Sequence, residues 1–235
     1  MDNLLQNVHP QWLEIVNEAM YAMDPNYLQY LTTSQEWLPG RDLLLAAFSR
    51  PRTTIKYVLL GESPYPRAAS ANGYAFWDAS VGSLWSAKGL SKEVNRATSL
   101  RNWLKMLLFA RGDLRNSFNQ ESIAQLDKAQ YVQTATEMFE SLIQQGFLLL
   151  NATLVFSKGQ VNFHARQWRP FVHSLLQQLE QQHNSVKLIL FGRIAQNIPE
   201  AGHFPSLKAE HPYNISFITN PDVVEFFKPM DLLKL

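Results

Sequence analysis

The sequence has no cysteine among its 235 residues. This absence excludes disulfide bonds, a cysteine nucleophile, and zinc or iron–sulfur sites held by thiolates. The formal net charge is only +1, so the chain has no overall basic field of the kind that attracts nucleic acid. Any binding to DNA would therefore need a local cationic groove.

Long hydrophobic runs are also missing. No apolar stretch approaches the roughly 20 residues that cross a bilayer. Residues 1–12 have neither the basic start nor the sustained apolar core of a signal peptide. We therefore expect a cytoplasmic protein with no membrane partner. A hydrophobic content of 46% and a charged content of 17% are typical of a globular chain, and the length fits a single domain over residues 1–235.

Apolar runs of strand length alternate with segments of helical spacing, and this alternation predicts the fold class. The predicted strands cover residues 55–60, 147–150, 186–191 and 207–209. Helices are predicted over residues 11–33 (with a new helix starting at Pro25), 42–48, 100–108, 131–145, 168–182 and 221–227. The pattern predicts an α/β fold, a three-layer α/β/α sandwich around a central, mainly parallel four-stranded sheet.

The loop after the first predicted strand is the segment around which the chain is organised. It reads GESPYP at residues 61–66, and its two prolines make it stiff. It carries an acid (Glu62), a hydroxyl (Ser63) and an aromatic ring (Tyr65). These groups indicate a catalytic loop, although an ordinary strand–loop connection with a surface glutamate would have the same composition.

Polar residues also follow the other predicted strands, namely Asn151, the pair Gly192-Arg193, and His211. The carboxyl ends of parallel strands lie at one edge of a sheet, so we expect these groups to converge with Glu62. Taken singly, Asn151 could cap the next segment and His211 could sit in a surface turn. Their convergence favours a functional site.

Five segments then occur in an order that resembles the uracil-DNA glycosylase superfamily, closest to its common monomeric branch. That branch carries GQDPYH, G-x-A-F, LLLN, WG-S-x-AQ and HPSPL. The counterparts here are GESPYP at 61–66, GYAF at 73–76, LLLN at 148–151, FGRIAQ at 191–196 and HPYNI at 211–215. The resemblance covers about residues 37–227 and leaves out the N-terminal helical segment, residues 1–36.

The resemblance implies a monomeric DNA-repair enzyme that needs neither metal nor cofactor. Such an enzyme acts in base excision repair, on DNA that contains uracil. It flips the uracil out of the DNA, hydrolyses its N-glycosidic bond and leaves an abasic site.

Roles carried over from the family place four residues on the base. Phe76 would stack on the flipped uracil, and Asn151 would read its edge by accepting from N3–H and donating to O4. Tyr65 would lie against C5 and exclude the methyl group of thymine, since such a clash commonly costs ~1–3 kcal/mol. His211, as a neutral donor, would stabilise the negative charge that develops on O2.

The remaining roles concern the DNA itself. Ile215 takes the place of the family's leucine wedge, which fills the gap left by the flipped base. Ser99 and the pair Gly192-Arg193 would contact phosphate groups, where Arg193 could add a charge-assisted hydrogen bond.

The first motif departs from the family at its water-activating aspartate, because Ser63 occupies that position. Serine carries no negative charge to favour a cationic sugar. We expect Glu62 to take over the role from one residue earlier, in the arrangement of the G-E-[AG]-P-G motif of the superfamily's thermophilic iron–sulfur branch. Alternatively, Glu62 points into solvent.

Two other readings stay open. The protein could bind DNA or a uracil-like base but cleave poorly or not at all, and act as a sensor, scaffold or accessory factor. It could also prefer another base, since Pro66 replaces the family's histidine and both Asn72 and Tyr74 flank the pocket differently.

Overall fold

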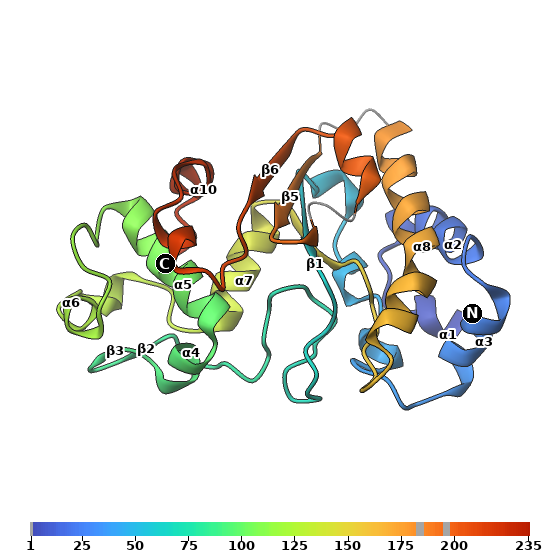
Figure 1. Cartoon of the computed structure of the whole chain (residues 1–235), viewed down its shortest axis with the longest axis horizontal. Helices are drawn as coiled ribbons and strands as arrows, with labels where there is room; N and C mark the ends of the chain where they lie inside the picture. The colour runs from blue at the N-terminus through green and yellow to red at the C-terminus, as the bar shows by residue number, and fades with distance from the viewer. Residues whose placement is uncertain (1, 182–185, 195–197) are drawn as a thin grey trace. The chain divides into compact units, whose positions relative to one another are not determined.

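The computed structural model describes residues 2–181, 186–194 and 198–235. The chain forms two compact units, described separately below. Unit 1 comprises residues 1–78, 146–189 and 196–206, and unit 2 comprises residues 79–145, 190–195 and 207–235. Figure 1 labels the helices and strands along the chain.

One four-stranded sheet has the strand order β4-β1-β5-β6. Its strands are β1 (Tyr57–Gly61), β4 (Phe147–Asn151), β5 (Lys187–Phe191) and β6 (Ser206–Ala209). β1 and β4 run parallel and pair residue by residue from Tyr57 opposite Phe147 to Gly61 opposite Asn151. The central, parallel sheet with flanking helices confirms the predicted α/β fold class, and all four predicted strands are present.

The described residues of unit 1 form four α-helices and five short 3₁₀ helices. The α-helices are α1 (Asp2–Leu5), α2 (Leu13–Tyr21), α3 (Pro25–Thr33) and α8 (Val161–Gln181). The 3₁₀ helices are η1 (Pro10–Trp12), η2 (Arg41–Leu43), η3 (Ala46–Phe48), η4 (Arg52–Thr54) and η6 (Pro199–His203). α2 packs against α8, as Figure 1 shows. Pro25 begins α3 as expected, because Asp24 caps it by accepting from the Asn26 amide.

A buried hydrogen-bonded triad joins α3 to α8 in unit 1. The Trp168 Nε1–H donates to the Tyr27 hydroxyl at 3.1 Å, and that hydroxyl shares a hydrogen bond of 2.7 Å with Nδ1 of His164. His164 is fully buried, and burial lowers its pKa, which favours the neutral ring. Burial also raises the pKa of Tyr27, which keeps the hydroxyl protonated.

Unit 2 contains a hairpin of β2 (Trp85–Ser86) and β3 (Gly89–Leu90), which form a separate two-stranded sheet. Its helices are α4 (Lys92–Arg96), α5 (Thr98–Arg111), α6 (Gln120–Ala124), α7 (Ala135–Gln144) and α10 (Pro221–Phe227). Its described residues also form three 3₁₀ helices, η5 (Lys128–Gln130), η7 (Ile215–Thr219) and η8 (Lys228–Met230). The helix predicted over 221–227 is confirmed with the same bounds.

The core of unit 2 is built around Trp103 on α5. Its indole packs edge-on against the rings of Phe191, Phe217 and Phe227, with ring centroids 5.6–6.2 Å apart. Such edge-to-face pairs stabilise beyond the apolar area that they bury. They fix α5 against the segments that follow β6 in the chain.

Two predicted helices have different starts in the structure. The helix predicted from residue 131 begins at Ala135, because Thr134 and Glu137 form a capping box. The Glu137 carboxylate accepts from the backbone amides of Thr134 at 2.8 Å and Gln133 at 2.7 Å. These two hydrogen bonds lower the pKa of Glu137. The helix predicted from residue 168 begins at Val161, seven residues earlier, and Pro170 lies inside it.

The predicted helix over residues 42–48 consists of the two 3₁₀ turns η2 and η3. Gln182, the last residue of the helix predicted over 168–182, lies outside the described residues. Within the described part of the chain, no helix is long and apolar enough to cross a membrane. There, too, no group of three or more His, Asp or Glu side chains is placed to hold a metal ion. The assignment of residues 1–235 to one domain stays a prediction.

We predict that Tyr27→Phe lowers the free energy of unfolding by about 2–4 kcal/mol, because it leaves both Trp168 Nε1 and His164 Nδ1 buried without a partner. Chemical denaturation measures the change. Tyr30→Phe is the matched control, since the Tyr30 ring stacks on Tyr27 while its hydroxyl makes no hydrogen bond within the described residues. Equal losses in both variants would contradict the assigned role of the triad.

Candidate functional site

The first group of predicted site residues lies in unit 1, where β1 and β4 end together. Gly61 is paired with Asn151, and the amide of Ala152 donates to the Gly61 carbonyl at 2.8 Å. One residue further on, the Thr153 amide donates to the Glu62 carbonyl at 3.0 Å. The backbone of the loop's first residues is therefore fixed to the end of β4.

Gly61 allows the Asn151 amide to lie directly against the backbone. A Cβ at position 61 would be 2.5 Å from Asn151 Oδ1 and 2.9 Å from the Ala75 Cβ. The Asn151 residue is only 3% exposed, yet its amide makes no hydrogen bond to any described residue. Buried amides are normally satisfied, so this one has a donor and an acceptor available for a ligand.

A hydrogen bond joins Tyr65 and Phe76, the two residues whose rings are predicted to contact the base. The Tyr65 hydroxyl donates to the Phe76 carbonyl at 3.2 Å, and Phe76 itself has a φ of 64°. A non-glycine residue in this left-handed region is strained by about 1–2 kcal/mol, and such residues cluster at functional sites. The Ala75 amide donates to the Leu149 carbonyl at 3.1 Å, which ties the segment to β4.

A buried carboxylate supports the same segment. Asp78 accepts from Arg67 at 3.1 Å, joining the two ends of the stretch that carries Phe76. Burial, together with the nearby negative charge of Asp78, raises the pKa of Tyr65 to about 12. The Tyr65 phenol therefore stays protonated and remains a hydrogen-bond donor.

Glu62 is more exposed than the other predicted site residues of unit 1. The Glu62 side chain is exposed and makes no hydrogen bond or ion pair with a described residue, whereas Ser63 is half-buried, as are Tyr65 and Phe76. The Glu62 backbone is fixed and its carboxylate is not. This position is compatible with a carboxylate that meets substrate and with one that faces solvent, so the role of Glu62 stays a prediction.

The second group lies in unit 2, after β5 and β6. The Gly192 amide donates to the Ala209 carbonyl at 2.9 Å, and Gly192 has a φ of 73°. A Cβ there would lie 2.9 Å from the His211 Cβ, so the glycine permits a close approach of the two segments. The structure thus brings Gly192 and His211 together, and Arg193 follows with an exposed side chain.

The tautomer of His211 follows from its own loop. Nδ1 of His211 accepts from the Tyr213 amide at 3.1 Å, so the ring proton is on Nε2. The Asn214 amide in turn donates to the His211 carbonyl at 2.9 Å. The imidazole is therefore arranged as a neutral Nε2–H donor.

The loop after His211 exposes apolar side chains. Ile215 is 80% exposed and Tyr213 is 68% exposed. Both belong to the large apolar side chains that the described residues leave exposed. Ser99 is half-buried in the first turn of α5, where free backbone N–H groups favour anions.

Asn102, which the sequence analysis did not single out, positions this loop. Its residue is buried on α5, and its Nδ2 donates to the carbonyls of Pro212, Tyr213 and Asn214 at 2.8, 3.2 and 3.4 Å. A polar residue on the apolar face of a predicted helix, between Leu100 and Trp103, was the available indication. Its partners could not be known without the fold.

Two residues of the fourth motif, Ala195 and Gln196, lie outside the described residues.

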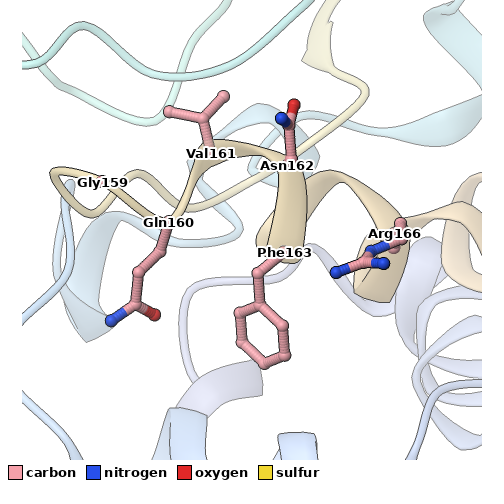
Figure 2. A pocket seen from close by; sticks show the side chains of 6 residues that line it. All are labelled: Gly159, Gln160, Val161, Asn162, Phe163 and Arg166. Atoms are coloured by element: carbon pink, nitrogen blue, oxygen red, sulfur yellow. The ribbon is translucent and has the colours of Figure 1, made fainter.

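A separate cavity of about 550 Å³ lies at the start of α8 and is lined by Gly159 to Phe163 and by Arg166. Figure 2 shows Val161 and Asn162 pointing to one side and Gln160 and Phe163 to the other. These side chains do not converge, so we assign no site there.

We predict that Gly61→Ala displaces the Asn151 amide, because the added methyl group would overlap Oδ1 and the Ala75 side chain. A crystal structure of the variant measures the displacement, and thermal unfolding should show a loss of about 1–3 kcal/mol. Gly202→Ala is the control, since a Cβ there meets no atom within 4 Å. An unmoved amide would contradict the close-packing argument.

We also predict that Asn102→Asp loosens residues 212–214. The substitution keeps the shape of the side chain but replaces a donor by an oxygen that repels three carbonyls. Hydrogen exchange at the Tyr213 and Asn214 amides should become at least about tenfold faster, equivalent to about 1.4 kcal/mol. Asn162→Asp, at an exposed position, is the control. Unchanged exchange would show that Asn102 does not hold the loop.

Comparison with known proteins gives the family. The family model described as the uracil DNA glycosylase superfamily matches residues 48–230. The wild-type UNG crystal structure from Nitratifractor salsuginis is 43% identical, has a TM-score of 0.94 and is covered to 96%, with 99% of this chain aligned.

More distant relatives agree. The uracil-DNA glycosylase of Fusobacterium nucleatum is 26% identical over 226 residues, which cover 90% of this chain and 84% of the relative. The mimivirus uracil-DNA glycosylase structure, at 19% identity and a TM-score of 0.58, shares the fold over 89% of this chain and 71% of its own. The chain belongs to the uracil-DNA glycosylase superfamily.

Proposed function

We propose that the protein is a DNA-repair glycosylase that hydrolyses the N-glycosidic bond of uracil flipped out of DNA. The observation that carries the proposal is the buried Asn151 amide with no hydrogen bond to a described residue. The uracil edge presents N3–H as a donor and O4 as an acceptor, and one amide group complements both. Family membership supports the same conclusion.

Base selection is assigned to the residues around this amide. The Phe76 ring stacks on the uracil, and the strained backbone at this residue is consistent with a functional constraint. Tyr65, held by its hydrogen bond to the Phe76 carbonyl, lies against C5 and excludes the thymine methyl group. A fixed ring excludes a methyl group better than a mobile ring does, because it cannot move aside at low energetic cost.

Bond cleavage is assigned to two residues. As the N1–C1′ bond lengthens, negative charge develops on uracil O2, and the neutral Nε2–H of His211 donates to it. Glu62 orients or deprotonates the attacking water and stabilises the cationic sugar, in place of the aspartate whose position we assign to Ser63. These roles require both residues to act on one nucleotide. No cofactor or metal enters the proposed reaction.

DNA contacts are assigned to the exposed positions. Ile215 inserts into the gap that the flipped base leaves, and its exposure suits a wedge that is buried only in the complex. Ser99, Gly192 and Arg193 bind phosphate groups. The enzyme acts as a monomer.

A second candidate function is DNA binding without efficient cleavage, in a sensor, scaffold or accessory role. It is favoured by the exposed Glu62 side chain together with a serine at position 63. Such a protein would keep the affinity provided by the base-reading residues. A changed base preference is a third outcome that the same assay detects with other modified oligonucleotides.

We predict that the wild type releases free uracil from a uracil-containing oligonucleotide and leaves an abasic site. Glu62→Gln should reduce the single-turnover rate by about 100-fold or more, the usual size of a general acid–base contribution. Ser63→Ala should retain activity, and Asn151→Ala should lose it because the uracil edge is no longer read. Strand cleavage at the abasic site by alkali measures product formation.

Glu14→Gln, an exposed acid on α2, is the charge-matched control. Full activity in Glu62→Gln would remove Glu62 from the mechanism. An inert wild type that nevertheless binds the oligonucleotide would favour the second function.

A further inference from the structure

Unit 2 contains a cavity of about 720 Å³ that none of the assignments above uses. Its walls come from α5, from residues 116–121 and from η7. Ile215, the assigned wedge, forms part of the wall together with Ile218. Any DNA that receives the wedge must therefore bring nucleotides close to this cavity.

Two cations on α5 line the cavity, and neither forms an ion pair with a described residue. Arg101 and Lys105 are one helical turn apart and half-buried, and the Arg101 Nη1 donates to the Asn95 carbonyl at 2.8 Å. Lys105 makes no hydrogen bond or ion pair with any described residue. Like charges at this spacing repel each other, so an anion bound between them would relieve a cost that the free protein carries.

The electrostatics of Lys105 agree with this geometry. Burial, and then the positive charge of Arg101, lower the pKa of Lys105. Both effects disfavour the ammonium form until an opposite charge is nearby. Glu121 is the single acid among the lining residues, against two cations.

Other residues of the lining offer groups that suit a sugar or base. Phe118 is half-buried and held edge-on by Phe109, with centroids 5.6 Å apart, which fixes its ring. Asn119 and Gln120 use their side-chain oxygens internally, accepting from the amides of Ser122 and Leu90. Their NH₂ groups make no hydrogen bond to a described residue and remain as donors.

We propose that this cavity binds a nucleotide of the DNA strand opposite the uracil, with its phosphate between Arg101 and Lys105 and its sugar or base against Phe118. The strand assignment rests on the lining of the cavity. It includes Ile215 and Ile218 but not His211, Gly192 or Arg193, the unit 2 residues assigned to the uracil-bearing strand. A wedge that fills the place of a flipped base separates that strand from its complement.

This inference rests on the proposed function. The experiment below is designed so that failure of the cavity proposal can be told apart from failure of the proposed function. Uracil release is measured on matched single-stranded and duplex oligonucleotides for the wild type, Arg101→Gln/Lys105→Gln and Lys105→Gln. The single variant leaves the Arg101 hydrogen bond to Asn95 intact, so it guards against local unfolding in the double variant. Lys234→Gln, an exposed residue outside the cavity, is the charge-matched control.

We expect the ratio of duplex to single-stranded activity to fall about tenfold in the double variant and less in Lys105→Gln. The salt dependence of duplex binding should also weaken by about 1–2 in the log–log slope, one unit per lost phosphate contact. An equal fall on both substrates would place the contact on the uracil-bearing strand and overturn the proposal. An unchanged ratio and slope would overturn it as well.

If the wild type releases no uracil, the proposed function fails but the cavity is still tested. Equilibrium affinities of the same variants are then compared for uracil-free duplex and single-stranded oligonucleotides. A preferential loss for duplex in the double variant supports the cavity as the site for the second strand. Equal affinities in wild type and variant overturn it.

Discussion

The close packing of two strand ends, at Gly61 and Asn151, is the constraint on which the unit 1 site depends. The parallel register of β1 and β4 sets these residues opposite each other, and the absence of a side chain at Gly61 gives the amide its space. The same pairing fixes the backbone of Glu62 through Thr153. A shift of one residue in register would turn the amide to the other face of the sheet.

Much of this arrangement was predictable from the sequence, because it depends on local patterns. Apolar runs of strand length predicted all four strands, and the helix predicted over 221–227 begins at Pro221 as expected. The polar residues after the strands were also identifiable, since parallel strands end at one edge. The start of α7 was missed although the Thr134/Glu137 capping box is visible in the sequence.

Other features depend on contacts between distant segments and could not be predicted. The left-handed backbone of Phe76 has no local cause, because no glycine or asparagine occupies the position. Asn102 bonds to carbonyls 110 or more residues away, so its partners follow from the folded chain alone. The net charge of +1 is a sum over the whole chain, so it gave no indication of the half-buried pair of cations on α5.

Because α5 is one continuous helix, insertions and deletions within it are constrained. Ser99, Arg101, Asn102 and Lys105 lie within two turns of one unbroken helix. Inserting or deleting a single residue among them would rotate everything downstream by about 100° around the helix axis. The number of residues between these four positions therefore fixes the side of the helix on which each side chain lies, as well as the distances between them. Length changes in this region of the chain are compatible with the fold only beyond the ends of the helix, for example in the turn after Arg111.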